Sequence, residues 1–536
     1  MGKSDEGFHG HAVRERNVPP TGVTFRAGRF GRMFPELAVP LAPPDEQLVE
    51  LGLSMVDGGT APGAGDNAHI PAGFTYLGQF IDHDVTLDTT TLMETVQDPS
   101  SVENFRTPRL DLDSVYGLGP RVHPSLYDRH SPGSAKLLVG LTDVGGGDPK
   151  VRSGLQHDLP RNAQGLAIIG DERNDENLLV AQTHVAFLRF HNAMVDRLEG
   201  TVGKDDLFAA ARRAVVELYQ AMVIRDFLAR ICDVNDLAAA IERRRFFRFE
   251  TFGRFAQPYI PVEFSVAAYR FGHTMVRQDY SHNRVFRPET FGSSLDVFFR
   301  FTGKSGVIGM PGEAVALPSD WVIDWRRYVD FRTTDKSDGF RLNLTRTIDP
   351  YLSPALHRLK GKPGEVGQGD ASADRSLAVM NLRRGVKMML PAAQDVVRFT
   401  GVEPLAADEI ASSGDDGAVA AKLGLHLRTP LWYYVLKEAQ IRQGGRRLGP
   451  LGSLIVAETF IGMMQGDPQS ILSRDPTWRF GEPITGLALE GADRRFGFAD
   501  LIRIASGVPD GTDEETMKPL LSPVDDPANL SQAPTV

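Results

Sequence analysis

The chain has 536 residues and a mass of 58.8 kDa, and its 41% hydrophobic and 24% charged residues are typical of a globular protein with a large core. Its 59 basic and 69 acidic residues leave a net charge of −10, which argues against a surface that binds nucleic acid or anionic lipid. No run approaches the roughly 20 apolar residues of a membrane span, and the first residues lack the apolar stretch of a secretory signal.

Cysteine usage excludes several kinds of site. Cys232 is the only cysteine, so the chain has no intrachain disulfide, no thiolate zinc cluster and no iron–sulfur cluster with cysteine ligands. Any metal must be bound by histidine, carboxylate or carbonyl groups. We therefore expect a cytoplasmic protein, or one exported without a classical signal, that has no disulfides.

Turn-forming residues mark both ends of the chain. An N-terminal arm at 1–45 and a tail at 508–536 lack sustained periodicity, and we expect them to pack as extended segments or to be mobile. Residues 46–507 are predicted to form one large domain, because they contain no long linker and no internal repeat. Apolar residues recur with helical period at 178–198, 207–231, 377–390, 431–441 and 454–464, and alternation typical of strands is scarce. The fold class predicted is mainly α, a single large helical domain with long irregular loops and little β structure.

The first candidate site lies in YLGQFIDHDVTLD at 76–88, where His83 stands between Asp82 and Asp84. If this segment is helical, these three residues face three directions and Gln79 shares the face of His83. Taken alone, such a tripeptide is most often a surface histidine between two acids that cap a helix.

Two further segments carry polar residues in chain order. In DERNDEN at 171–177, Arg173 and Glu176 would share a helical face, and a surface salt bridge is the usual interpretation. The next helix carries His184 and His191 on one face. They could be metal ligands, but packed and hydrogen-bonded core histidines are more common.

The last two segments are AAYRFGHTMVR at 267–277 and MNLRRGVKMMLP at 380–391. In the first, His273 follows a glycine, which leaves room for a flat ligand or another backbone to approach. In the second, Asn381 precedes two arginines in a helical pattern.

Taken in this order, the segments resemble the animal-type haem peroxidases of the peroxidase-cyclooxygenase superfamily, especially its bacterial members, over residues 70–470. The roles that the resemblance implies are distal histidine for His83, distal glutamine for Gln79, distal arginine for Arg173, axial iron ligand for His273 and hydrogen-bond partner of that ligand for Asn381. It also implies that Asp82 and Glu176 can form ester bonds with the haem, and that Arg270 and Arg384 lie near its propionates. RRLGPLGSLIVAETFIGMMQGD at 446–467 resembles a downstream helix of the same fold.

A calcium site is implied by the same resemblance. TPRLDLDSVYG at 107–117 is similar to the calcium loop of the family, in which Thr107, the Arg109 carbonyl, Asp111 and Asp113 join Asp84. Calcium takes six to eight oxygen ligands, and alternate residues of an extended loop can direct several oxygens at one point. Without the neighbouring Asp84, two acids that cap a turn would be the favoured interpretation.

The resemblance implies a haem b peroxidase that reduces hydrogen peroxide and oxidises small donors, such as halides, thiocyanate or phenols, through a ferryl intermediate. His83 would accept the peroxide proton and return it, because a histidine with a pKa near 6.5 can do both near neutral pH. Arg173 would stabilise the charge on the departing oxygen, and Asn381 would accept the N–H of His273.

Departures from the family leave alternatives open. Arg270 stands where cyclooxygenases have their radical tyrosine, and Tyr269 is one residue away, about 100° round a helix, which disfavours prostaglandin-type oxygenation. Asn177 stands where myeloperoxidase has a methionine linked to haem, so that link should be absent. The alternatives are a fatty-acid haem dioxygenase and a haem- or calcium-binding protein with a vestigial peroxidase site. The oligomeric state is left open.

Overall fold

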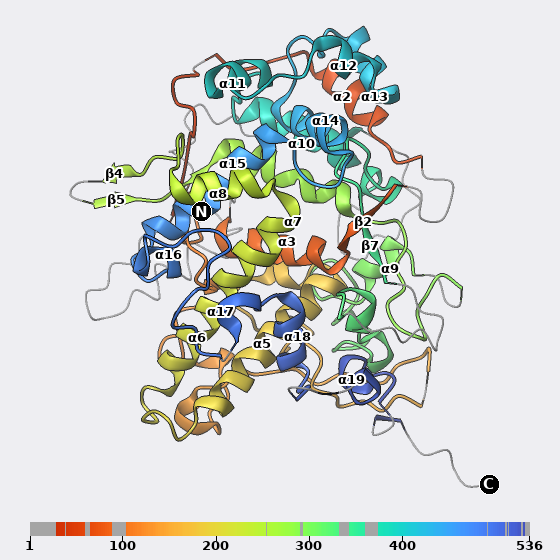
Figure 1. The fold of residues 1–536 in the computed structure, drawn as a ribbon. Helices are drawn as coiled ribbons and strands as arrows, with labels where there is room; N and C mark the ends of the chain where they lie inside the picture. The colour runs from red at the N-terminus through yellow and green to blue at the C-terminus, as the bar shows by residue number, and fades with distance from the viewer. Residues whose placement is uncertain are drawn as a thin grey trace, which may run out of the picture.

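A computed structural model of the chain is shown in Figure 1. The structure describes residues 28–37, 39–58, 65–87, 103–148, 150–252, 255–289, 293–331, 342–359, 373–489, 491–509, 512, 514–526 and 529–530.

The described part of the chain is mainly helical, which confirms the predicted fold class. The longer helices are α2 (Asp45–Ser54), α3 (Gly73–Val85), α5 (Leu178–Leu198), α6 (Leu207–Met222), α10 (Leu377–Lys387), α14 (Leu431–Gln443) and α15 (Pro450–Gly466). The shorter ones are α4 (Asp113–Tyr116), α7 (Ala229–Ile231), α8 (Val234–Glu242), α9 (Leu295–Arg300), α11 (Ala393–Thr400), α12 (Ala407–Ser412), α13 (Gly414–Lys422), α16 (Ile471–Arg474), α17 (Ala492–Arg495), α18 (Phe498–Ala505) and α19 (Glu514–Leu521). Long connections separate many of them.

Within these residues, β structure is limited to short strands in three small sheets. The strands are β1 (Gly28–Gly31), β2 (Asp66–Pro71), β3 (Glu103–Asn104), β4 (Glu250–Phe252), β5 (Phe255–Gln257), β6 (Ile260–Pro261) and β7 (Leu344–Arg346). Strand β1 lies between β3, which is antiparallel to it, and β6, which is parallel. Strands β2 and β7 pair with each other, and β4 and β5 form a hairpin at the edge of the molecule (Figure 1).

Each of the five predicted helical segments is helical in the structure. The prediction for 178–198 is confirmed to the residue as α5. The segment 207–231 is continuous but changes type, because a π-helical stretch, Val223–Leu228, separates α6 from α7. The segment 377–390 ends early, at Lys387, since Met389 takes a left-handed conformation (φ 53°) and Pro391 follows.

The terminal segments are partly described. Residues 1–27 and 38 of the arm lie outside the described residues, and from Gly28 the arm runs extended through β1. The extended conformation expected for the tail is wrong at α19, which packs against a 3₁₀ helix, Trp325–Arg327, and buries Met517 and Leu521. Packing against a distant segment therefore overrides the weak local pattern.

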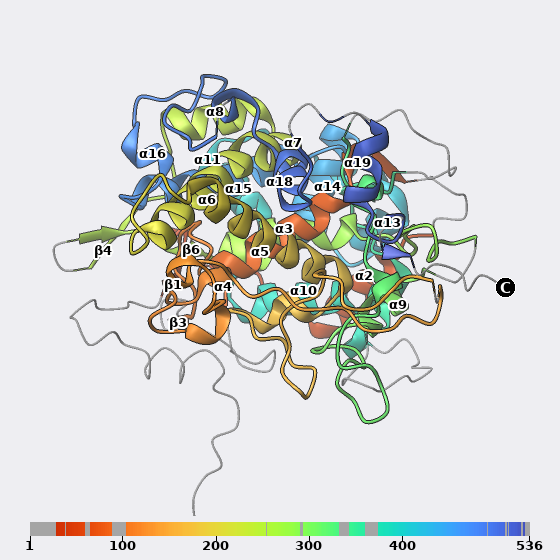
Figure 2. The ribbon, with the colours of Figure 1, turned by 90° about the horizontal axis from the view of Figure 1, so that it is seen from below.

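One large apolar cluster forms the core, and α3 runs through its middle. Helix α3 packs against α5 on one side and against the segment 268–275 on another, and α5 packs in turn against α6 (Figure 2). The central helix thus lies between two of the segments singled out in the sequence. In the part of the chain that the structure describes, no helix combines the length and apolar character needed to cross a lipid bilayer.

Candidate functional site

Helix α3 carries the first candidate residues into the interior, and 10 of its 13 residues are buried. His83 is 5% exposed and Asp84 is fully buried, so the interpretation of this tripeptide as a surface histidine between capping acids is wrong. Gln79 and His83, four residues apart in one helix, share a face as predicted.

The His83 ring is held by one amide. Its Nδ1 donates a hydrogen bond to Asn174 Oδ1 at 2.9 Å, and its Nε2 lies 3.8 Å from Glu176 Oε1. Because an amide oxygen can only accept, the ring proton is on Nδ1 and the lone pair is on Nε2. Burial, together with the nearby charge of Arg173, lowers the pKa of His83 to about 3. The ring is therefore a neutral base directed toward Glu176.

Arg173 is fixed by acceptors on two sides. Its Nε and Nη2 donate to the two oxygens of Asp171, at 3.1 and 2.7 Å, and Nη2 also reaches the backbone carbonyl oxygens of His83 (3.1 Å) and Thr86 (2.6 Å). Arg173 does not form the expected salt bridge with Glu176, because its guanidinium pairs with Asp171 instead. Burial alone would raise the pKa of Asp171, but Arg106 and Arg173 hold it well below its usual range.

A second amide network lies beside His83. Asn177 Nδ2 donates to Gln79 Oε1 at 2.9 Å, and Gln79 Nε2 donates to Glu176 Oε1. The Asn177 Oδ1 accepts from Val180 N at 3.0 Å and so caps the first turn of α5. Burial raises the pKa of Glu176 to about 7. An asparagine directly before a helical pattern is an N-cap signal that was present in the sequence.

The carboxyl-bearing residues Asp82 and Glu176 are neither fully buried nor exposed. Burial raises the pKa of Asp82, whose Oδ1 accepts from Thr86 Oγ1 at 3.1 Å. The Glu176 side chain is nevertheless 30% accessible. A side chain added at Gly272 would meet no atom within 4 Å, so there is free space beside His273.

His273 lies in a 3₁₀ helix, Ala268–Met275, that packs against α3. Asn381 on α10 donates from Nδ2 to His273 Nδ1 at 2.9 Å, while its Oδ1 accepts from Arg270 Nη1 at 2.7 Å. The expectation that Asn381 accepts the N–H of His273 is therefore wrong in this arrangement, because the Arg270 guanidinium occupies the amide oxygen. Burial lowers the pKa of His273 to about 3, and the charge of Arg270 acts in the same direction.

These residues fit a haem held between two histidines. Both rings are neutral, and a neutral imidazole is the form that binds iron. The charges of Arg173 and Arg270 both act on Asp82, which places that carboxyl between the two arginines. Arg384 is buried on α10, three residues after Asn381. An axial role for His273 Nε2 requires its proton on Nδ1, and hence Asn381 turned so that its oxygen faces the ring.

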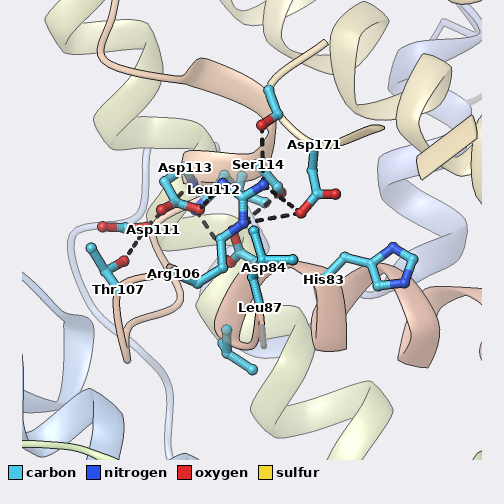
Figure 3. A network of polar contacts seen from close by, with 12 residues as sticks. His83, Asp84, Leu87, Arg106, Thr107, Asp111, Leu112, Asp113, Ser114 and Asp171 are labelled. Atoms are coloured by element: carbon cyan, nitrogen blue, oxygen red, sulfur yellow. Dashed lines mark hydrogen bonds and ion pairs between the residues drawn. The ribbon is translucent and has the colours of Figure 1, made fainter. Parts of the chain in front are cut away.

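A cluster of three carboxyl groups includes Asp84, the residue after His83, and the His83 ring points away from the cluster (Figure 3). One ligand oxygen from each of Asp84, Asp111 and Asp113 lies within 4.8 Å of the others. Oxygens bound to one calcium ion are at most about 5 Å apart, so this spacing suits calcium. Burial and the neighbouring carboxylates raise the pKa of Asp84 well above its usual range, and burial raises the pKa of Asp111 to about 6.

The loop around this cluster is tightly bonded. Thr107 Oγ1 donates to Asp111 Oδ1 at 3.1 Å, and the side chain of Arg109 is directed at Asp467, with Nη1 3.8 Å from Oδ1. Arg106, which the sequence did not single out, bridges Asp113 and Asp171 and thereby joins the carboxyl cluster to the partner of Arg173 (Figure 3). The predicted calcium residues are therefore coupled to the histidine site.

Two histidines of α5 are core residues, as the more common interpretation predicts. His191 contacts the Tyr116 hydroxyl at 3.0 Å and the Ala135 carbonyl oxygen at 2.8 Å. His184 contacts Asn174 Nδ2 at 3.0 Å. Sequence reasoning gave Asn174 no role, although it directly follows Arg173.

Tyr269 has a different environment from the one expected. Its segment is 3₁₀-helical, so its offset from Arg270 is about 120° rather than 100°. The hydroxyl donates to the Gly78 carbonyl oxygen at 3.1 Å, and the ring stacks on Phe264 with centroids 4.6 Å apart. The phenol is thus held against the backbone of α3.

A family model for animal haem peroxidases matches residues 86–300. The chain is also 24% identical over 323 residues to human eosinophil peroxidase, covering 56% of this chain and 39% of that protein. Residues 86–300 are therefore similar to the animal haem peroxidase domain. The matched residues include Arg173 and His273, while His83 and Asn381 lie outside the match and are joined to them by the fold.

Solved structures share the fold of the chain. Peroxidase A from Dictyostelium discoideum aligns with a TM-score of 0.54 at 18% identity, over 85% of this chain and 92% of that one. A fatty acid alpha-dioxygenase from Arabidopsis thaliana aligns with a TM-score of 0.58 at 13% identity, over 87% and 76%. At these identities the likeness concerns the fold alone. The chain spans 39% of the length of the eosinophil relative, well under two thirds.

Proposed function

We propose that this protein is a haem peroxidase that binds haem b between His273 and His83 and uses it to reduce hydrogen peroxide while oxidising small donors such as halides, thiocyanate or phenols. The observation that carries this proposal is the pair of neutral histidines on two segments that pack against each other, α3 and the 3₁₀ helix Ala268–Met275, each bonded at Nδ1 to an asparagine. When bound, haem supplies the redox chemistry of the reaction.

His83 is the proposed catalytic base. Among the described residues no donor bonds to its Nε2 lone pair, so Nε2 can accept the proton of incoming hydrogen peroxide and return it to the departing oxygen. A general base of this kind contributes about 10² to 10⁴-fold in rate. Because its pKa lies near 3, the ring is in the base form before peroxide arrives.

Arg173 supplies a fixed positive charge beside this base. Asp171 and two carbonyl groups hold the guanidinium in place, so no reorganisation is needed when negative charge develops on the departing oxygen. Gln79, whose oxygen is occupied by Asn177, presents its N–H groups toward Glu176.

The carboxyl groups of Asp82 and Glu176 are proposed sites of ester bonds to the haem. Burial raises the pKa of both groups because it disfavours their charged forms, and an ester would remove the charge from the interior altogether. Arg270 and Arg384 are proposed to lie near the propionates.

A calcium ion is proposed to bind Asp84, Asp111 and Asp113, with Thr107 Oγ1 and the Arg109 carbonyl oxygen as further ligands. Three buried carboxylates repel one another, and a divalent cation would compensate their charge. The ion would tie the loop at 107–113 to α3 and thereby hold the backbone that carries His83.

The alternatives receive less support. A fatty-acid dioxygenase has a structural relative in favour of it, but Tyr269 is hydrogen-bonded to the α3 backbone and packed between aromatic rings. A vestigial haem- or calcium-binding protein would need no base and no arginine opposite His273.

The test is the absorption spectrum of the haem-loaded protein before and after one equivalent of hydrogen peroxide. We expect a Soret band that His273→Ala removes and that His69→Ala, at an exposed histidine, leaves unchanged. Peroxide should shift the band, and bromide, iodide or a phenol should restore it. A Soret band that does not respond to peroxide would support the binding-protein alternative, and oxygen uptake with a fatty acid would support the dioxygenase.

A further inference from the structure

Asn174 lies between two buried histidines from different elements. Its Oδ1 is 2.9 Å from Nδ1 of His83 on α3, and its Nδ2 is 3.0 Å from Nδ1 of His184 on α5. His83 is 5% exposed, and Asn174 and His184 are fully buried, so water does not compete for these bonds. Among the described residues, no other group bonds to His83 Nδ1.

An amide has one accepting end and one donating end, so its orientation decides where both histidines carry their protons. In the observed orientation His83 is protonated on Nδ1 and His184 on Nε2. If the amide turned over, Nδ2 would donate to His83 Nδ1 and the His83 proton would move to Nε2. The lone pair that faces Glu176 would then be lost.

His184 is the group that can hold this orientation. Its ring packs edge-on against Phe80 of α3, with centroids 5.9 Å apart and planes at 72°, and this contact supports the ring beside Asn174. Its Nε2 is buried without a hydrogen-bond partner, so Asn174 makes the one polar contact of this ring in the described structure. As long as His184 Nδ1 accepts this bond, turning Asn174 Nδ2 toward His83 would break it.

We propose that Asn174 and His184 are positioning residues for His83: the amide, held by His184 Nδ1, keeps the His83 proton on Nδ1 and its lone pair on Nε2. The catalytic consequence rests on the proposed peroxidase function, in which His83 Nε2 takes the peroxide proton. The arrangement of protons itself does not depend on haem.

The first experiment therefore uses the protein without haem. Long-range ¹H–¹⁵N NMR of histidine-labelled protein distinguishes Nδ1–H from Nε2–H rings, and the signals are assigned by their loss in His83→Gln and His184→Gln. We expect His83 as the Nδ1–H form and His184 as the Nε2–H form. Asn174→Asp, which can accept from both rings, should convert His184 to its Nδ1–H form and leave His83 unchanged.

Two further variants test the role of His184. His184→Phe keeps a ring against Phe80 but removes the acceptor, so His83 should become a mixture of both forms. His191→Phe is the matched control, because it removes a buried α5 histidine that contacts Tyr116 and Ala135 rather than Asn174. If His83 carries its proton on Nε2 in the wild type, or if Asn174→Asp and His184→Phe leave both rings unchanged, the inference is wrong.

The second experiment measures the rate of the peroxide-induced Soret shift in the haem-loaded variants. His184→Phe should slow it by about 2-fold, the loss expected when half of the His83 rings carry the proton on Nε2, and Asn174→Asp should retain most of the wild-type rate. If the tautomers of His83 and His184 change in the variants as expected, but the protein does not react with peroxide, the positioning role is supported and the proposed peroxidase function is wrong. A protein that reacts with peroxide at equal rates in all variants would overturn the positioning role alone.

Discussion

Asn177 donates a hydrogen bond from Nδ2 to Gln79 Oε1 at 2.9 Å, and this bond decides which end of the Gln79 amide faces Glu176. The same Asn177 side chain caps α5 through Val180 N. The Asn177 side chain therefore connects two elements of the site, α3 and α5, by hydrogen bonds.

Asn177→Ala should destabilise the protein because it removes the cap of α5 and the bond to Gln79. Loss of a helix cap typically costs about 1 kcal/mol, and a buried amide left without its partner adds to this. Asn177→Ser is the matched variant, since serine can cap the helix but cannot reach Gln79. Urea unfolding should place the serine variant between alanine and the wild type. Equal stability of the alanine and serine variants would show that the cap contributes nothing.

The raised pKa of Glu176 predicts that the stability of the protein depends on pH. Its folded pKa, about 7, is above its usual value near 4.5, so the folded protein binds the proton more tightly than the unfolded chain does. The stabilisation is complete below pH 4.5 and is lost as the pH rises toward 7. In the protein without haem, the free energy of unfolding should fall less over this range in Glu176→Gln than in the wild type. Glu172→Gln, an exposed neighbour paired with Lys304, should match the wild type.

The sequence predicted those parts of the fold in which the apolar periodicity and the tertiary packing favour the same structure. Helix α5 has strong apolar periodicity and an asparagine cap, and its predicted bounds are those of the structure. Helix α19 has a short pattern and depends on contacts with residues 325–327, so the sequence around it indicated only turns. The π-helical stretch Val223–Leu228 has no signal in a 3.6-residue period and was not predictable in this way.

The candidate site was also predictable only in part. Motifs placed His83, Arg173 and His273 as candidates, and the fold brings their segments against one another. The amide orientations were beyond sequence reasoning, because they depend on competition in space. At Asn381 the oxygen is taken by Arg270, and at Asn174 the two ends are shared between histidines of α3 and α5. Such competition is visible only when all the donors are in place.

Arg384 and Arg383 are neighbours on α10 with opposite environments, and they provide a matched test of haem binding. Arg384 is buried, whereas Arg383 reaches toward solvent and pairs with Asp45 and Asp374. If Arg384 binds a propionate, Arg384→Leu should weaken haem affinity and Arg383→Leu should not. Absorbance titration of the protein with haem measures both affinities. Equal affinities in the two variants would remove Arg384 from the site.

Calcium removal should destabilise the protein, because Asp84, Asp111 and Asp113 are left to repel one another in the interior. A ligand that binds only the folded state stabilises it by about 2.7 kcal/mol at 100 times its dissociation constant, so readdition of calcium should restore the melting temperature. Asp111→Asn should lower the affinity for calcium and reduce this response, whereas Asp205→Asn, at an exposed position, should retain it. Thermal unfolding with chelator and with calcium measures the response. A melting temperature that is the same in chelator and in calcium would exclude a structural calcium ion at these carboxyl groups, and the loop would then be tied to α3 by the hydrogen bonds that Leu112 N and Ser114 Oγ donate to Asp84.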